Sequence, residues 1–96
     1  MIFGVYAIKD IVAEKFMQPM FIQNDELAKR MFNEVINNTD LIKNNPVDFI
    51  MYKLSMYNSE TGIFYFSTEE WGEENALRLW SAAQVKAERG ENNGML

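Results

Sequence analysis

Residues 44–62 read NNPVDFIMYKLSMYNSETG, and this stretch decides the fold. Pro46 biases the residue before it toward extended backbone, and side chains then alternate in character from Asp48 to Tyr57, as in a half-buried strand. Asn58 to Thr61 supply turn residues, and Gly62 permits a positive φ before a short return strand at 63–66. The stretch therefore predicts a β-hairpin.

The two faces of the first strand in this hairpin differ in character. One set of alternate residues is apolar throughout, which predicts that it faces the core: Ile50, Tyr52, Leu54 and Met56. The other set mixes apolar and polar side chains, as expected of a partly solvated sheet face: Phe49, Met51, Lys53, Ser55 and Tyr57.

Two more strands are predicted upstream of this hairpin. Residues 2–9 are β-branched and aromatic with a period of two, and they are largely apolar on both faces, which predicts an inner strand that ends at Asp10. Residues 14–22 predict a second strand, joined to the first by a short connection at 10–13. Because Pro19 cannot donate a ladder hydrogen bond, this second strand should lie at an edge or break near Pro19.

Two helices are also predicted. Asn24 is followed by two acidic residues, which is typical of a helix start, and two asparagines close the helix near Thr39. Its apolar stripe predicts packing on a sheet: Ala28, Met31, Phe32, Val35 and Ile36. A polar connector is expected from Thr39 to Asn45. A second helix is expected to begin at Ser67 or Thr68 and to continue to Glu88.

The element order is therefore β-β-α-β-β-α. This order indicates an α+β fold, in which an antiparallel four-stranded sheet carries two helices on one face or at one end. Residues 1–90 are expected to form a single domain, because 96 residues make one core of ordinary size. Residues 91–94 are polar or small, and residues 91–96 are expected to form a flexible C-terminal tail.

The composition excludes several classes of function. The chain has no cysteine and no histidine, so thiolate and histidine metal sites and the Ser-His-Asp and Cys-His arrangements are unavailable. Four glutamates at 69–74 suit the first turns of the second helix better than they suit catalysis. We therefore expect no metal, no cofactor and no enzymatic activity. Neither a secretory signal nor a run of roughly 20 apolar residues is present, so no membrane partner is expected.

The net charge of -5 would repel a polyanion over the molecule as a whole, although a local basic patch can still bind one. The best candidate for nucleic-acid binding is the mixed sheet face with its neighbours: Lys9, Lys15, Phe49, Lys53, Tyr57 and Tyr65. A second interpretation of this face is an apolar layer that a helix or another subunit covers, and the residues alone favour it.

Several short motifs, in their order and spacing, resemble one known family. They are Val5 to Asp10, Gln18 to Phe21, Asn24-Asp25 with Ala28, Arg30 and Phe32, Pro46 to Phe49 with Tyr52 to Leu54, and Glu60 to Gly62. This pattern, which spans residues 3–66, is similar to the small nonstructural protein of gokushovirus-type microviruses, phages with single-stranded circular DNA. Two features differ from the family: Ser55 stands where glycine is frequent, and the acidic turn is reduced to Asn58-Ser59.

The resemblance implies a nonstructural phage protein in the host bacterial cytoplasm that binds DNA, single-stranded in our hypothesis, during genome replication or single-strand synthesis. A homo-oligomer is also expected, because a four-stranded sheet of this size leaves edges and one face to cover. The alternative is an acidic protein-interaction module that contacts a phage or host replication protein and binds no nucleic acid. Its candidate residues are Trp71 and Trp80, a residue type enriched at interface hot spots.

Overall fold

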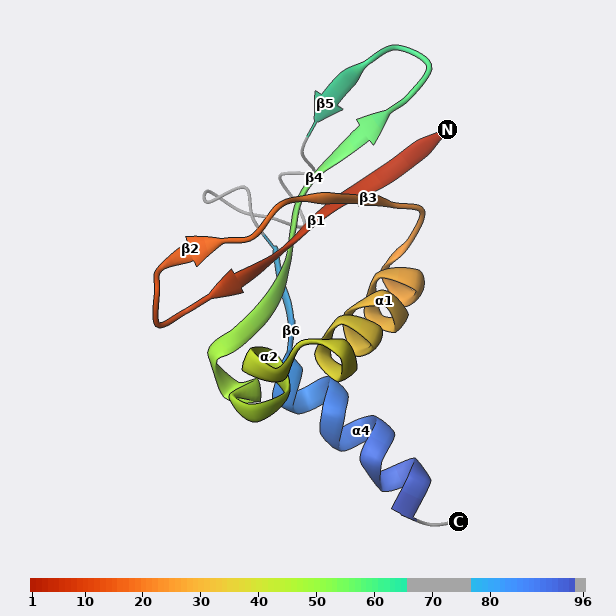
Figure 1. Ribbon diagram of the computed structural model, residues 1–96. Helices are drawn as coiled ribbons and strands as arrows, with labels where there is room; N and C mark the ends of the chain where they lie inside the picture. The colour runs from red at the N-terminus through yellow and green to blue at the C-terminus, as the bar shows by residue number, and fades with distance from the viewer. Residues whose placement is uncertain (66–76, 95–96) are drawn as a thin grey trace.

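The computed structural model describes residues 1–65 and 77–94. Two long strands form its centre, β1 (Ile2–Asp10) and β4 (Phe49–Asn58), and they pair antiparallel along the whole of β1 (Figure 1). Both strands are rich in β-branched, aromatic and other apolar side chains, which favour a buried, pleated surface. Every other described strand pairs with one of these two.

Four short strands extend the central pair, two on each side. β2 (Lys15–Phe16) and β3 (Met20–Ile22) both pair with the other edge of β1. β5 (Ile63–Tyr65) and β6 (Leu77–Ser81) both pair with the other edge of β4. All of these pairings are antiparallel, so the described residues form one six-stranded antiparallel sheet.

The α+β class and the antiparallel sheet are confirmed, but the number of strands is wrong. The second predicted strand breaks at Pro19 into β2 and β3, as that proline led us to expect. β6 lies inside the segment predicted as the second helix, where Leu-Arg-Leu-Trp suits a helix as well as a strand. The edge of β4 has unpaired backbone groups, and hydrogen bonding to this edge favours the strand over the helix at Leu77–Ser81. Residues 67–76 of that predicted helix lie outside the described residues.

Two of the helices begin at side-chain caps. α1 (Asp25–Asn38) starts where the sequence predicts, because the Asn24 side chain accepts the Leu27 N–H at 2.9 Å. α4 (Ala82–Gly94) starts at a capping box in which Ser81 Oγ accepts the Gln84 N–H at 3.1 Å and Gln84 Oε1 accepts the Ser81 N–H at 2.8 Å. Because α4 continues to Gly94, it includes residues 91–94 of the segment expected to be a flexible tail.

The connector predicted from Thr39 to Asn45 is wrong, because a short helix, α2 (Asp40–Asn44), occupies it. Its Ile42 is buried in the core, and this tertiary contact stabilises a helix too short to be stable alone. The residues before β4 form a 3-10 turn, η1 (Pro46–Asp48), in place of an extended entry. Proline suits the first position of such a turn, since it has no N–H to leave unpaired there.

The core lies between the helices and one face of the sheet, which we call the helix side (Figure 1). The strands contribute Tyr6, Ile8, Ile22, Phe49 and Met51 to it. The helices contribute Ala28, Phe32, Ile36, Ile42, Ala82 and Val85. Each large apolar side chain buried here stabilises the fold by about 1.5–3 kcal/mol.

The predicted faces of β4 are wrong in its first half. Phe49 and Met51 point into the core on the helix side, and Ile50 and Tyr52 therefore lie on the opposite face, where Ile50 is nevertheless buried as predicted. Both sets are apolar here, so alternation alone does not distinguish the core face. The physical difference is that η1 and the helices approach the Phe49 side.

A β-bulge at Leu54 then reverses the alternation in β4. Val5 pairs with Ser55 and Tyr6 with Lys53, which leaves Leu54 without a partner on β1. Beyond this bulge the even-numbered residues of β4 lie on the helix side, so Met56 lies on the side of the core as predicted. A strand that changes phase in the middle cannot be assigned by one uniform period of two.

Gly4 on β1 lies directly under the ring of Tyr6. A methyl group at Gly4 would be 2.5 Å from Tyr6 Cε1 and 2.6 Å from Tyr6 Cζ. The Tyr6 side chain is fully buried, so its ring has little space to move away. The absence of a side chain at Gly4 is therefore a packing requirement of the core.

We expect Gly4→Ala to lower the free energy of unfolding by about 1–3 kcal/mol, because it overpacks the space that the Tyr6 ring occupies. Urea denaturation followed by circular dichroism would measure this change. Gly62→Asn is the matched control, since Gly62 has a φ of +75° with no atom within 4 Å of an added Cβ, and asparagine tolerates this backbone. An equal loss in both variants would contradict the packing argument.

Candidate nucleic-acid interface

The sheet face opposite the helices carries aromatic side chains from five strands. Strand register places Phe3, Val5, Ala7 and Lys9 of β1 on this face, together with the residues that pair beside them. We call it the aromatic face and define it by its aromatic and basic members beyond Phe3: Lys9, Phe16, Phe21, Tyr52, Tyr57, Phe64 and Arg78.

The first cluster on this face consists of Lys9, Phe16 and Tyr52. The rings of Phe16 and Tyr52 meet edge to face, with their centroids 5.3 Å apart. Lys9 Nζ lies 5.5 Å from the Phe16 centroid and 5.9 Å from the Tyr52 centroid, within cation–π range of both rings. Ala7 lies on β1 between these strands, and its single methyl group leaves the two rings room to meet.

The second cluster consists of Phe21, Tyr57 and Phe64. The Phe21 centroid lies 5.2 Å from that of Tyr57 and 6.0 Å from that of Phe64, and the Tyr57 and Phe64 centroids are 4.8 Å apart. Phe21 is 49% exposed and Phe64 is 54% exposed, although both belong to strands. Large exposed apolar side chains that gather on one face are typical of an interaction site.

The charge of the aromatic face differs from that of the whole chain. Lys9 and Arg78 lie on it, and none of the described strand positions that register places on this face is Asp or Glu. Carboxylates of the described residues lie on the helices and at the hairpin ends, for example Glu34 on α1 and Glu60 in the β4–β5 turn. The face can therefore stack against aromatic groups and accept an anion at Lys9 and Arg78.

The structure separates the six residues that the sequence suggests for nucleic-acid binding. The aromatic face holds two of them, Lys9 and Tyr57. The other four lie elsewhere: Phe49 in the core, Lys53 and Tyr65 on the helix side of the sheet, and Lys15 opposite Asp10 at the end of the β1–β2 hairpin.

Sequence reasoning missed Phe16 and Phe21, which are five residues apart. A continuous strand would place them on opposite faces, but the break at Pro19 resets the alternation, and each then pairs beside an odd-numbered residue of β1. The Pro19 break is the signal that could have suggested this. Phe64 follows from the register of the β4–β5 hairpin with Tyr57.

The two tryptophans suggested for protein interaction have different outcomes. Trp80 is half-buried on the helix side and packs against the core, with Lys29 Nζ 5.6 Å from its ring. Trp71 lies outside the described residues.

Residues 3–70 match the model of one protein family, described as Phage ORF5 protein. This match covers more than half of the 96 residues. The chain belongs to this family. The resemblance to phage proteins that the motifs indicate is thereby confirmed at the level of the family. No curated protein and no solved structure matches the chain.

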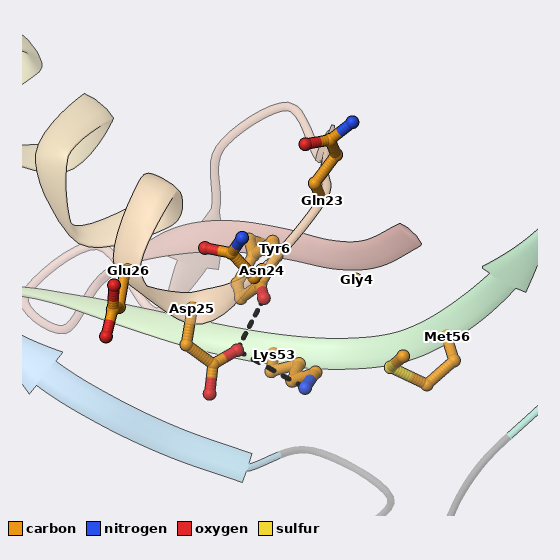
Figure 2. Close-up of a pocket in the computed structure, with 8 residues that line it drawn as sticks. All are labelled: Gly4, Tyr6, Gln23, Asn24, Asp25, Glu26, Lys53 and Met56. Atoms are coloured by element: carbon orange, nitrogen blue, oxygen red, sulfur yellow. Dashed lines mark hydrogen bonds and ion pairs between the residues drawn. The ribbon is translucent and has the colours of Figure 1, made fainter. Parts of the chain in front are cut away.

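The chain also has a polar cleft of about 430 Å³ on the helix side, between α1 and the central strands (Figure 2). The Tyr6 hydroxyl donates to Asp25 Oδ1 at 2.5 Å, and Lys53 Nζ lies 3.3 Å from the same oxygen. Burial raises the pKa of Tyr6, and the hydrogen bond and negative charge of Asp25 raise this pKa further. The three side chains connect the start of α1 to β1 and β4.

The described residues of the chain show neither a membrane helix nor a metal cluster. None of the helices in 1–65 and 77–94 is long and apolar enough to cross a membrane. In the same ranges, no group of three or more acidic side chains could hold a metal ion.

We expect Tyr6→Phe to lower the free energy of unfolding by about 1 kcal/mol at neutral pH, because it removes a hydrogen bond to a half-exposed carboxylate. Tyrosine loses its proton near pH 10 in the unfolded chain but later in the folded one, so wild-type stability falls as the pH rises above about 10. The difference between wild type and variant should therefore narrow there. Urea titrations of wild type and variant at neutral pH and above pH 10 measure this difference in the free energy of unfolding. A difference that widens above pH 10 would contradict the argument.

Proposed function

We propose that this phage protein binds single-stranded DNA through the aromatic face, in the cytoplasm of the infected bacterium, during genome replication or single-strand synthesis. The observation that carries the proposal is the pair of exposed aromatic clusters, with Lys9 over two of the rings. Origin in a gokushovirus-type microvirus is part of the same proposal, and it is supported by the motifs from Val5 to Gly62 and by the family match.

Stacking supports a single-stranded ligand. An aromatic side chain that stacks on a base contributes about 1–3 kcal/mol, and every base offers a π face, so this contact needs no particular sequence. In a duplex the bases already stack on one another, and flat rings on a sheet cannot reach their faces. The exposed rings of Phe16, Phe21 and Phe64 therefore suit unpaired bases.

Electrostatics contribute less than stacking to this proposal. Lys9 and Arg78 on the aromatic face would contact about two phosphates, which predicts a shallow salt dependence. With a slope of about -0.7 per phosphate on a single strand, raising salt from 50 to 200 mM should weaken binding roughly sevenfold. The proposed activity is binding and not catalysis, which agrees with a chain that has neither histidine nor cysteine.

The alternative of a protein-interaction module has less support in the structure, because Trp80 packs against the core. The predicted homo-oligomer is a competing use of the aromatic face, since a second copy could cover the exposed rings of Phe16, Phe21 and Phe64. The experiment below separates this use from DNA binding.

We expect Phe64→Ala to weaken binding of a 20-nucleotide oligo(dT) by about 5-fold or more, because it removes one stacking ring from the second cluster. Fluorescence anisotropy of a labelled oligonucleotide at 50 mM salt measures this change. Phe64 is more than half exposed, so the fold should tolerate the substitution, and circular dichroism checks it.

Tyr65→Ala is the matched control, since Tyr65 is the next residue of β5 and lies on the helix side of the sheet. It should leave DNA binding unchanged. If wild type binds no oligo(dT) at 50 mM salt, the proposed function is wrong. If Phe64→Ala dissociates an oligomer in light scattering while DNA binding stays the same, the aromatic face is a contact between copies.

A further inference from the structure

The two aromatic clusters are separated by the same distance along the central strand β1 on both of its sides. Phe16 and Phe21 pair with β1 residues that are four positions apart, and so do Tyr52 and Tyr57 on the other side of β1. At about 3.3 Å per residue, this offset corresponds to about 13 Å along the strand direction. The clusters are thus two separate stacking surfaces on one line parallel to β1.

The two clusters differ in charge. The first contains Lys9, and Arg78 pairs with Tyr52 beside it on β6 with an exposed side chain. At the described strand positions around the second cluster, register places no Lys or Arg on this face: the neighbours of Phe21 and Tyr57 are Phe3, Val5 and Ser55. Phosphate contacts therefore concentrate at the first cluster, whereas the second cluster offers stacking alone.

We infer that one DNA strand runs along β1 across both clusters, anchored by phosphate and base contacts at the first and by base stacking at the second. This inference rests on the proposed function and adds the path and the length of the ligand. Bases that stack on protein rings are not stacked on one another, so the bound strand is extended and advances about twice the 3.4 Å of a stacked strand at each nucleotide. About three nucleotides then span about 13 Å and engage both clusters, whereas a dinucleotide reaches only one.

When one DNA strand contacts both clusters, binding at the second cluster becomes intramolecular. This raises the affinity far more than the larger number of positions at which a longer oligonucleotide can bind. We therefore expect wild type to bind an eight-nucleotide oligo(dT) at least about tenfold more tightly than a dinucleotide of dT. The measurement is fluorescence anisotropy with 5′-labelled oligonucleotides at 50 mM salt.

Three variants test what each cluster contributes to binding: Phe16→Ala, Phe64→Ala and Tyr65→Ala. Phe16→Ala should weaken binding of both oligonucleotides, because the first cluster is used by each. Phe64→Ala should weaken binding of the eight-nucleotide strand by about fivefold or more and leave binding of the dinucleotide unchanged. Tyr65→Ala, on the helix side, should change neither. Circular dichroism confirms that each variant is folded.

Two results would overturn the inference while the proposed function stands. One is an eight-nucleotide strand that binds only a few times more tightly than the dinucleotide, as the larger number of positions at which a longer strand can bind would give by itself. The other is an equal loss for both lengths in Phe64→Ala, which would place both clusters on one short binding site. Absence of binding even to the 20-nucleotide oligo(dT) would instead remove the proposed function, and the inference with it.

Discussion

The antiparallel pairing of β1 with β4 is the constraint on which the rest of the molecule depends. All nine residues of β1 have a partner on β4, so this ladder fixes the phase of both strands and thereby the side on which each residue lies. The core and the aromatic face are the two sides of this one ladder. The bulge at Leu54 divides β4, so Phe49 and Met51 lie in the core before it, whereas Tyr57 lies on the aromatic face after it.

The position of α1 follows from the same pair of strands. Tyr6 of β1 and Lys53 of β4 are register partners, and both contact Asp25, the first residue of α1. Gly4 leaves the space in which the Tyr6 ring reaches this carboxylate. The polar contact therefore sets the start of the helix against the helix side of the sheet. With α1, α2 and α4 all on that side, no described helix covers the aromatic face.

The sequence predicts features that depend on a few adjacent residues. Asn24 with its acidic neighbours predicts the start of α1 because a cap acts within one turn, and Pro19 predicts a break because a missing N–H acts at one position. The features that it does not predict depend on contacts between distant segments. α2 exists because Ile42 reaches the core, and the bulge at Leu54 is visible only once Val5 and Tyr6 are placed beside it.

The limit of prediction from sequence is clearest at the candidate interface. Its aromatic residues were all visible in the sequence, but the face that each one occupies depends on three phase changes: the break at Pro19, the bulge at Leu54, and a second bulge in β6 where Met51 pairs with Trp80 and Tyr52 with Arg78. Uniform alternation places Tyr52 in the core and Phe49 on the surface, which is the reverse of the structure. The family resemblance indicated a phage protein, but residue motifs alone could not say which side chains share a face.

The net charge of -5 is compatible with a ligand that is a polyanion, because the charge is not evenly distributed. The described carboxylates of α1 and α2 lie on the helix side, and a layer of secondary structure is about 10 Å thick, close to the Debye length of about 8 Å at physiological salt. Their repulsion is therefore largely screened at the aromatic face, where Lys9 and Arg78 act at short range. In the DNA complex that we propose, the total charge would act mainly on the rate of encounter, whereas the strength of the bound state would depend on the rings that stack.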